Sequence, residues 1–183
     1  PTDDPHLGYW GRSLWQHAVE CGLASRRIAE ASGQADPEEA FVGGMLHDIG
    51  KLVMLLNLPD EHRHLRQRQL GGGGANLAAE RQGLGFDHTE VGRLLLERWN
   101  MPAALVACAS HHHAPAAADD HTLLVRVVEA GNLLSHVCGT LPDANGGDGQ
   151  LNELLASLAV PADALDRLTE RFARDLEECV ILS

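Results

Sequence analysis

The sequence predicts an all-α fold, a bundle of helices around an aliphatic core, on three observations. Apolar residues make up 44% of the 183 residues, enough for a well-filled core in a domain of this size. Aromatic residues are only 4%, so Leu and Ala must supply most of that core, and these residues favour helices over sheets. Apolar residues also recur every three or four positions, and no stretch alternates as a strand does.

Two helices are predicted in the first third of the chain. The first covers about residues 13–31, where apolar side chains return at helical spacing. The second has Asp36 as its N-cap and Pro37 at its first position, which is where proline suits a helix. It continues to about Asn57, because Pro59 cannot extend it.

An arginine-rich segment follows, with Arg63, Arg66 and Arg68, and then four glycines at positions 71–74. The basic cluster is short and fits the solvated face of a helix. A phosphate-binding loop would need a strand before the glycines and a Lys-Ser/Thr pair after them, and neither is present. The glycine run is therefore interpreted as a flexible connector.

The remaining helices are also marked by caps and breakers. Asp87 with Glu90 three residues later is a capping pattern, and Pro102 and Asp120 stand where two more helices begin. A second glycine-rich loop leads into two C-terminal helices, the last of which starts at Pro161. The expected helices cover residues 75–82, 88–99, 102–113 and 120–138 and two segments after residue 149.

Charge and composition exclude several classes of partner. The formal net charge is −12, and such a surface repels nucleic acids and anionic membranes. No stretch of 18 apolar residues and no leader pattern is present. Four distant cysteines without a Cys-x-x-Cys pair indicate buried thiols in a reducing compartment. We therefore expect a cytoplasmic protein that binds neither nucleic acid nor membrane.

The 11 histidines matter for where they fall on these helices. His17 borders the apolar face of the first helix, and Asp48 lies in an apolar stripe, where a carboxylate is costly unless it is paired. Taken singly, a buried His can be a hydrogen-bonded core residue and a buried Asp a helix cap. Together, imidazole and carboxylate groups suit a divalent transition metal: iron, manganese or zinc. The candidate metal ligands are His17, His47, Asp48, His88, His111, His112 and Asn132, whereas His113 and His121 are interpreted as exposed.

Four segments together resemble the HDOD group of the HD superfamily. They occur in the family's order and are LWQHAVECGLASRRIAE (14–30), FVGGMLHDIGKLVM (41–54), GFDHTEVGRLLLERWNMP (85–102) and SHHHAP (110–115). The resemblance implies an HD-superfamily helical bundle. The resemblance spans about residues 10–138, and the chain length predicts one domain over residues 1–183, with 145–183 as a C-terminal helical extension packed on it. The additional N-terminal helical half that HDOD domains generally have is not recognised here.

The resemblance also carries functional expectations. HDOD domains are mostly regulatory output modules of bacterial signalling, found beside other signalling domains. The related HD-GYP family hydrolyses cyclic di-GMP at a metal centre whose ligands are similar in order to the six candidate His and Asp residues above. In that family a lysine near the substrate phosphate corresponds to Lys51. Three positions depart from the HD-GYP pattern: Asn132 replaces an aspartate, Ser13 a glutamate, and 114–116 the Gly-Tyr-Pro segment.

Three hypotheses follow. The favoured one is a non-catalytic signalling module that binds a metal or a nucleotide such as a cyclic dinucleotide. The second is a metal-dependent phosphohydrolase or phosphodiesterase in which Lys51 steadies the phosphate. The third is a structural bundle whose histidines are satisfied internally. We expect other signalling domains or proteins as partners, and a homodimer is an alternative to core burial for the apolar C-terminal residues Leu176, Val180, Ile181 and Leu182.

Overall fold

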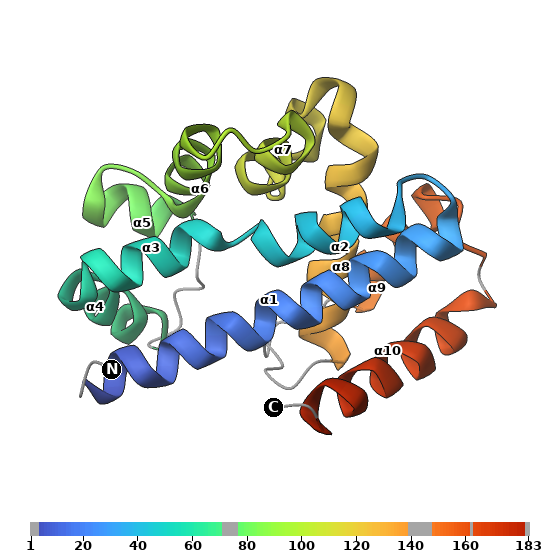
Figure 1. Ribbon diagram of the computed structural model, residues 1–183, viewed down its shortest axis with the longest axis horizontal. Helices are drawn as coiled ribbons and strands as arrows, with labels where there is room; N and C mark the ends of the chain where they lie inside the picture. Colours follow the sequence, from blue (N-terminus) through green and yellow to red (C-terminus); the bar gives the residue numbers. More distant parts are fainter. Residues whose placement is uncertain (1–3, 71–76, 139–147, 162, 182–183) are drawn as a thin grey trace.

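The computed structural model describes residues 4–70, 77–138, 148–161 and 163–181, and every regular element in these ranges is a helix, as predicted (Figure 1). The glycines at 71–74 and at 146 and 147 lie outside the described residues. The α-helices are α1 (Pro5–Ser32), α2 (Pro37–Leu46), α3 (Ile49–Asn57), α4 (Pro59–Leu70), α5 (Leu77–Leu84), α6 (His88–Arg98), α7 (Ala103–His111), α8 (Thr122–Cys138), α9 (Asp148–Ser157) and α10 (Ala164–Ile181).

The long helix α1 packs against several of the other helices. It contacts α2, α3, α8 and α10, and in Figure 1 α2 and α3 follow it on one side while α10 follows it on the other. Glycines allow the close approach of α1 to its neighbours. A Cβ on Gly44 would lie 2.8 Å from the carbonyl oxygen of Cys21, and a Cβ on Gly131 would overlap Ser25. The helix begins at Pro5, earlier than the start predicted at about residue 13.

The helix predicted from Asp36 to Asn57 is two helices. Asp36 caps α2 as predicted, since its Oδ1 accepts hydrogen bonds from the backbone N–H groups of Glu38 (3.0 Å) and Glu39 (2.9 Å). The helix is interrupted at His47 and Asp48 and resumes at Ile49. Adjacent residues of a regular helix point about 100° apart, so the interruption lets both side chains reach the same interior space.

Other boundaries were predicted with mixed success. Asp87 caps α6 as predicted, and its Oδ1 accepts from the backbone N–H of Thr89 (2.9 Å) and Glu90 (3.1 Å). Asp120 does not begin α8, because it lies inside a 3₁₀ turn over Asp119–His121 that precedes the helix. The C-terminal helix α10 starts at Ala164, three residues after the proline taken as its start.

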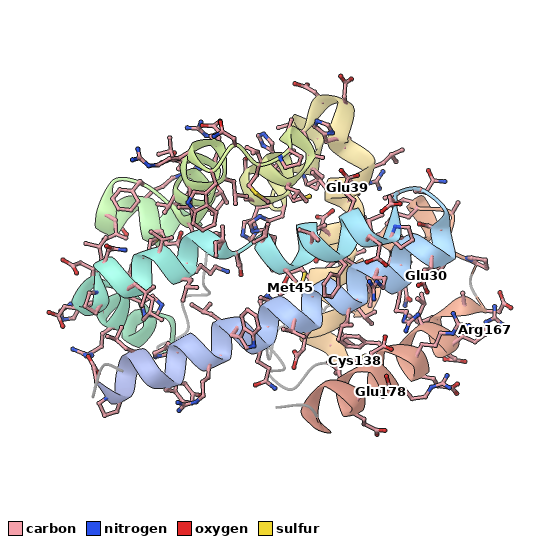
Figure 2. The ribbon with its side chains drawn as sticks, in the orientation of Figure 1. Glu30, Glu39, Met45, Cys138, Arg167 and Glu178 are labelled. Carbon is pink, nitrogen blue, oxygen red and sulfur yellow. The ribbon has the colours of Figure 1, made fainter. Side chains whose placement is uncertain are left out.

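One continuous core joins the two C-terminal helices to the rest of the bundle. Phe172 of α10 is fully buried in the same cluster as Val128 of α8 and Ile28 of α1. Met45 of α2 lies against Gly22 of α1 (Figure 2). Glu30 of α1 and Arg167 of α10 line a pocket between these two helices.

Within the described residues, no single helix has the length and hydrophobicity needed to cross a membrane. One helix pair, bent by 116° at Leu58, meets those two criteria only when its parts are counted together.

Candidate metal centre

Four separate segments bring their histidines to one buried place. His17 comes from α1, His47 and Asp48 from the α2–α3 interruption, His88 from the first turn of α6, and His112 from the end of α7. All five side chains are buried, and none is more than 9% exposed. Buried polar groups at this density are costly unless they pair with one another or with an ion.

The first of two ligand groups consists of His17, His47 and Asp48. One potential ligand atom from each lies within 4.8 Å of the others. Asp48 Oδ2 lies 3.3 Å from His47 Nε2 and 3.7 Å from His17 Nε2, and it accepts a 2.6 Å hydrogen bond from Lys51 Nζ. We call these three residues the HD group.

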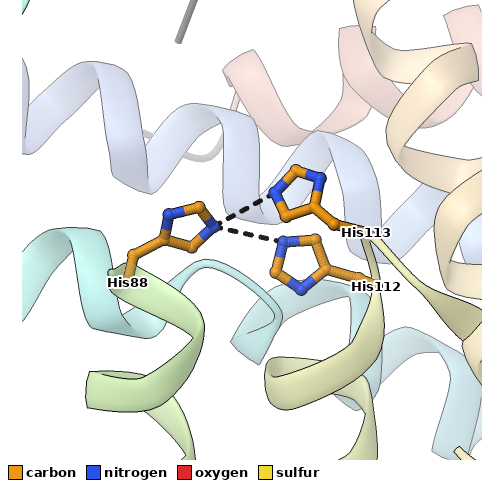
Figure 3. Close-up of side chains that lie close together, drawn as sticks. All are labelled: His88, His112 and His113. Atoms are coloured by element: carbon orange, nitrogen blue, oxygen red, sulfur yellow. Dashed lines mark hydrogen bonds between the residues drawn. The ribbon is translucent and has the colours of Figure 1, made fainter. Parts of the chain in front are cut away.

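The second group consists of His88, His112 and His113 (Figure 3). His88 Nε2 lies 3.4 Å from His112 Nε2 and 3.2 Å from His113 Nε2. Three imidazole nitrogens that face one another across such distances leave a space that a metal ion of tetrahedral or octahedral preference can use. We call these residues the three-histidine group.

Asp48 connects the two groups. Its Oδ2 faces the HD group, while its Oδ1 lies 3.4 Å from His88 Nε2 and 3.5 Å from His112 Nε2. Although Asp48 occupies the N-cap position of α3, its carboxylate forms no capping hydrogen bond. The helix-cap explanation of this buried carboxylate is therefore wrong, and its two oxygens instead lie between two sets of imidazoles.

The rings are held by bonds to Nδ1, which leaves Nε2 directed inward. The Nδ1 atom of His47 lies 2.7 Å from the Gly44 carbonyl oxygen, and that of His112 lies 3.1 Å from the Cys108 carbonyl oxygen. His17 Nδ1 lies 3.5 Å from Ser135 Oγ. Anchoring one ring nitrogen in this way fixes the tautomer, so the other nitrogen is available as a ligand.

Burial and charge keep most of these groups in the form that binds metal. Burial, aided by the charge of His47, lowers the pKa of His17 to about 3, and burial lowers that of His112 to about 4. Burial opposes the charge of Asp48, but His47 and Lys51 hold its pKa well below the usual range. Burial also opposes protonation of His47, yet Asp48 outweighs it and raises the His47 pKa. The proton on His47 would therefore compete with a metal ion for this place.

The donor set fits a transition metal. Among the described residues, the buried atoms without a hydrogen-bond partner include Asp48 Oδ1, His47 Nε2 and Asn132 Oδ1. Unsatisfied buried polar atoms are rare in folded proteins, and two of these three belong to the HD group. Nitrogen and carboxylate donors of this kind suit zinc, iron or manganese. These unpaired atoms favour a metal centre over the internally satisfied bundle of the third hypothesis.

The structure places the seven predicted ligands unequally. It brings His17, His47, Asp48, His88 and His112 together. His111 belongs to neither group, whereas His113, which was not among the predicted ligands, belongs to the three-histidine group. Helix α7 ends at His111, and the chain then turns so that Nε2 of His113, an exposed residue, lies 3.2 Å from His88 Nε2. Asn132 is half-buried on α8, two residues before the core residue Leu134.

Two residues near the groups were not predicted. Glu80 of α5 is buried and binds His88 through its Oε2, and burial opposes its charge while His88 lowers its pKa. His136 stacks on His17 with ring centroids 4.8 Å apart. Glu80 gave no sequence signal because it lies on a separate short helix eight residues from its partner. His136 lies one turn after Asn132, so helical spacing could have identified it.

Comparison with known proteins agrees with this architecture. A model of the HDOD domain family matches residues 4–115. An uncharacterised protein of Treponema pallidum (strain Nichols) is 26% identical over 134 residues, which is 72% of this chain and 25% of that protein. The chain therefore spans about a quarter of the length of the curated relative it matches.

Two solved structures share the fold. A candidate phosphohydrolase from Shewanella amazonensis SB2B superposes with a TM-score of 0.70 at 23% identity, over 94% of this chain and 61% of that one. A candidate signal transduction protein from Marinobacter aquaeolei VT8 superposes with a TM-score of 0.77 at 20% identity, over 92% of this chain and 38% of that one. At these identities the similarity shows the fold alone.

Proposed function

This chain belongs to the HDOD domain family, and from that premise we propose that it is a non-catalytic regulatory module of bacterial signal transduction with a transition-metal centre. The observation that carries the metal centre is Asp48, a buried carboxylate with one oxygen toward each ligand group and no capping role. The signalling role is supported by the family and by the similar fold of the Marinobacter protein.

The two groups define which residues would hold metal. His17, His47 and Asp48 would hold one ion, and His88, His112 and His113 would hold a second next to Asp48 Oδ1. Asn132 stands where the resemblance expects an aspartate. An amide oxygen is a weaker ligand than a carboxylate, so this departure favours retention of metal over efficient hydrolysis.

A metal-dependent phosphohydrolase is the second candidate, and Lys51 favours it. Bound metal would supply Lewis acidity, on which the hydrolysis of phosphoesters such as a cyclic dinucleotide depends. Lys51 Nζ is only partly buried and could turn from Asp48 toward a substrate phosphate. In the structure, however, its ammonium group is hydrogen-bonded to Asp48 Oδ2. That contact makes Lys51 a neutralising partner of the centre, which fits the non-catalytic function.

The experiment is elemental analysis of protein purified without added metal or chelator, followed by a cyclic di-GMP hydrolysis assay on the same sample. We expect one or two equivalents of iron, manganese or zinc and no turnover. Turnover would replace the regulatory proposal by the phosphohydrolase one. Absence of metal, with none taken up on titration, would contradict the metal centre.

Asp48→Ala tests the ligand assignment, with Asp36→Ala as its matched control. Both aspartates flank α2, but Asp36 is a surface N-cap remote from the histidines. Each substitution should lower the free energy of unfolding by about 1–2 kcal/mol. Only Asp48→Ala should lower the metal content sharply. Equal metal content in the two variants would contradict a ligand role for Asp48.

A further inference from the structure

Glu80 makes an unusual contact with the three-histidine group. Its Oε2 lies 2.7 Å from His88 Nδ1 and also accepts a 2.8 Å hydrogen bond from the backbone N–H of His88. The residue is 7% exposed, although it comes from α5, a short helix that contributes no residue to either ligand group. A carboxylate is costly to bury, and here the imidazole and the backbone N–H of His88 stabilise that of Glu80.

The contact determines which nitrogen of His88 can bind metal. A carboxylate accepts only, so the Nδ1 that faces it carries the proton and Nε2 keeps its lone pair. Nε2 is the atom that lies 3.4 Å from Asp48 Oδ1 and 3.2 Å from His113 Nε2. Glu80 therefore fixes both the tautomer and the direction of the ring.

Glu80 differs in charge from the other ring anchors. His47 and His112 are held by backbone carbonyl oxygens and His17 by the hydroxyl of Ser135, all of them neutral. An ionised acceptor draws the Nδ1 proton toward itself and makes Nε2 a more basic ligand. The three-histidine group lacks an anionic ligand of its own apart from Asp48, so negative charge behind His88 would strengthen it more than any neutral anchor.

We infer that Glu80 is a positioning residue for the three-histidine group, acting through His88 to set its tautomer and raise its affinity for a divalent transition metal. The inference rests on the proposed metal centre for the affinity, but the tautomer is a property of the metal-free protein. This separates a failure of the inference from a failure of the proposed function.

A structural explanation competes with this one, because Glu80 also accepts from the first backbone N–H of α6 and could serve only as a cap. Asp87 provides the matched control. It caps the same helix end through the backbone N–H groups of Thr89 and Glu90, and its other carboxylate oxygen pairs with Arg81. If capping is all that Glu80 does, Asp87→Asn should reproduce the effects of changing Glu80.

The test measures two quantities on the full chain. The ring-nitrogen shifts of His88 in ¹⁵N-labelled, metal-free protein report its tautomer, and titration with Zn²⁺ reports affinity. For the wild type we expect His88 protonated at Nδ1. Glu80→Ala should shift the population toward protonation at Nε2, and Glu80→Gln, which keeps the shape and an acceptor oxygen, should weaken Zn²⁺ binding by roughly 10–100-fold. Asp87→Asn should change neither quantity.

Each other outcome has a definite meaning. An unchanged His88 tautomer in Glu80→Ala overturns the inference, whether or not the wild type binds metal. Equal Zn²⁺ affinities of the wild type and Glu80→Gln overturn it as well, as does an equal loss in Asp87→Asn. If the wild type binds no Zn²⁺ but the tautomer of Glu80→Ala shifts, the proposed metal centre fails and the positioning role of Glu80 stands.

Discussion

Asp48 is the residue whose environment explains the centre best. Its charge is stabilised by Lys51 at 2.6 Å, and the imidazoles of His47, His88 and His112 surround it at 3.3–3.5 Å. Its Oδ1 nevertheless has no hydrogen bond. Single residues of this kind are ambiguous, whereas a carboxylate between two imidazole groups is an arrangement that suits a metal ion.

His113 and His111 give a residue-scale prediction. His113 belongs to the three-histidine group and His111, two residues earlier, does not. Loss of a partner outside the ligand shell commonly costs 10–100-fold in metal affinity, so loss of a ligand should cost at least about tenfold. We expect His113→Ala to weaken Zn²⁺ binding by that amount and His111→Ala to leave it unchanged, measured by competition with a chromophoric chelator. The reverse ranking would restore the ligand set predicted from helical phase.

At the scale of elements, the packing of α3 on α6 sets the distance between the two ligand groups. Gly50, two residues after Asp48, lies so close to the first turn of α6 that a Cβ would overlap the carbonyl oxygen of His88 and lie 2.8 Å from the Gly92 nitrogen. Both obstacles are backbone atoms, which cannot rotate away as a side chain can. The position of His88 relative to Asp48 therefore depends on the absence of a side chain at residue 50.

Gly50→Ala should separate α3 from α6. We expect a loss of about 3 kcal/mol or more in the free energy of unfolding, together with weaker metal binding. Gly11→Ala is the control, because a Cβ there meets no atom within 4 Å and alanine is the better helix former. It should stabilise the protein by about 0.5–1 kcal/mol. Chemical denaturation measures the free energy of unfolding of both variants. A Gly50→Ala variant as stable as wild type would contradict the close contact.

At the scale of the whole molecule, the C-terminal helices belong to the same core as the helices that bear the ligands. Phe172 is fully buried, and Arg27 of α1 holds Asp175 of α10 through two hydrogen bonds of 2.7 and 2.6 Å. Leu176 packs against the same cluster. The side chains of Val180 and Ile181, and Leu182 itself, lie outside what the structure describes.

Phe172→Ala tests whether α10 folds together with the rest. A large buried aromatic side chain replaced by alanine typically costs about 3–5 kcal/mol. Because the cluster is continuous, we expect that loss in a single unfolding transition seen by both far-UV circular dichroism and tryptophan fluorescence. Glu178→Ala, an exposed change on the same helix, should stay within about 0.5 kcal/mol of wild type. Two separate transitions would show that α10 folds independently of the bundle.

The sequence by itself determined the fold class, several helix ends and five of the residues that converge at the centre. Helical periodicity, N-caps such as Asp36 and Asp87, and breaking prolines are local signals, and local backbone physics decides them. The adjacent His47 and Asp48 were identified for the same reason, since an inward carboxylate is conspicuous in an apolar stripe.

Only the tertiary structure decided how those residues meet. The interruption of the helix at His47, the turn that brings His113 in place of His111, and the contact of Glu80 with His88 each depend on how separate helices pack. The helical period gives the direction of a side chain within one helix, but it carries no information on the distance between two helices. Metal ligands and their anchors require distances accurate to a fraction of an ångström, and those are fixed by packing such as that of Gly50 against His88.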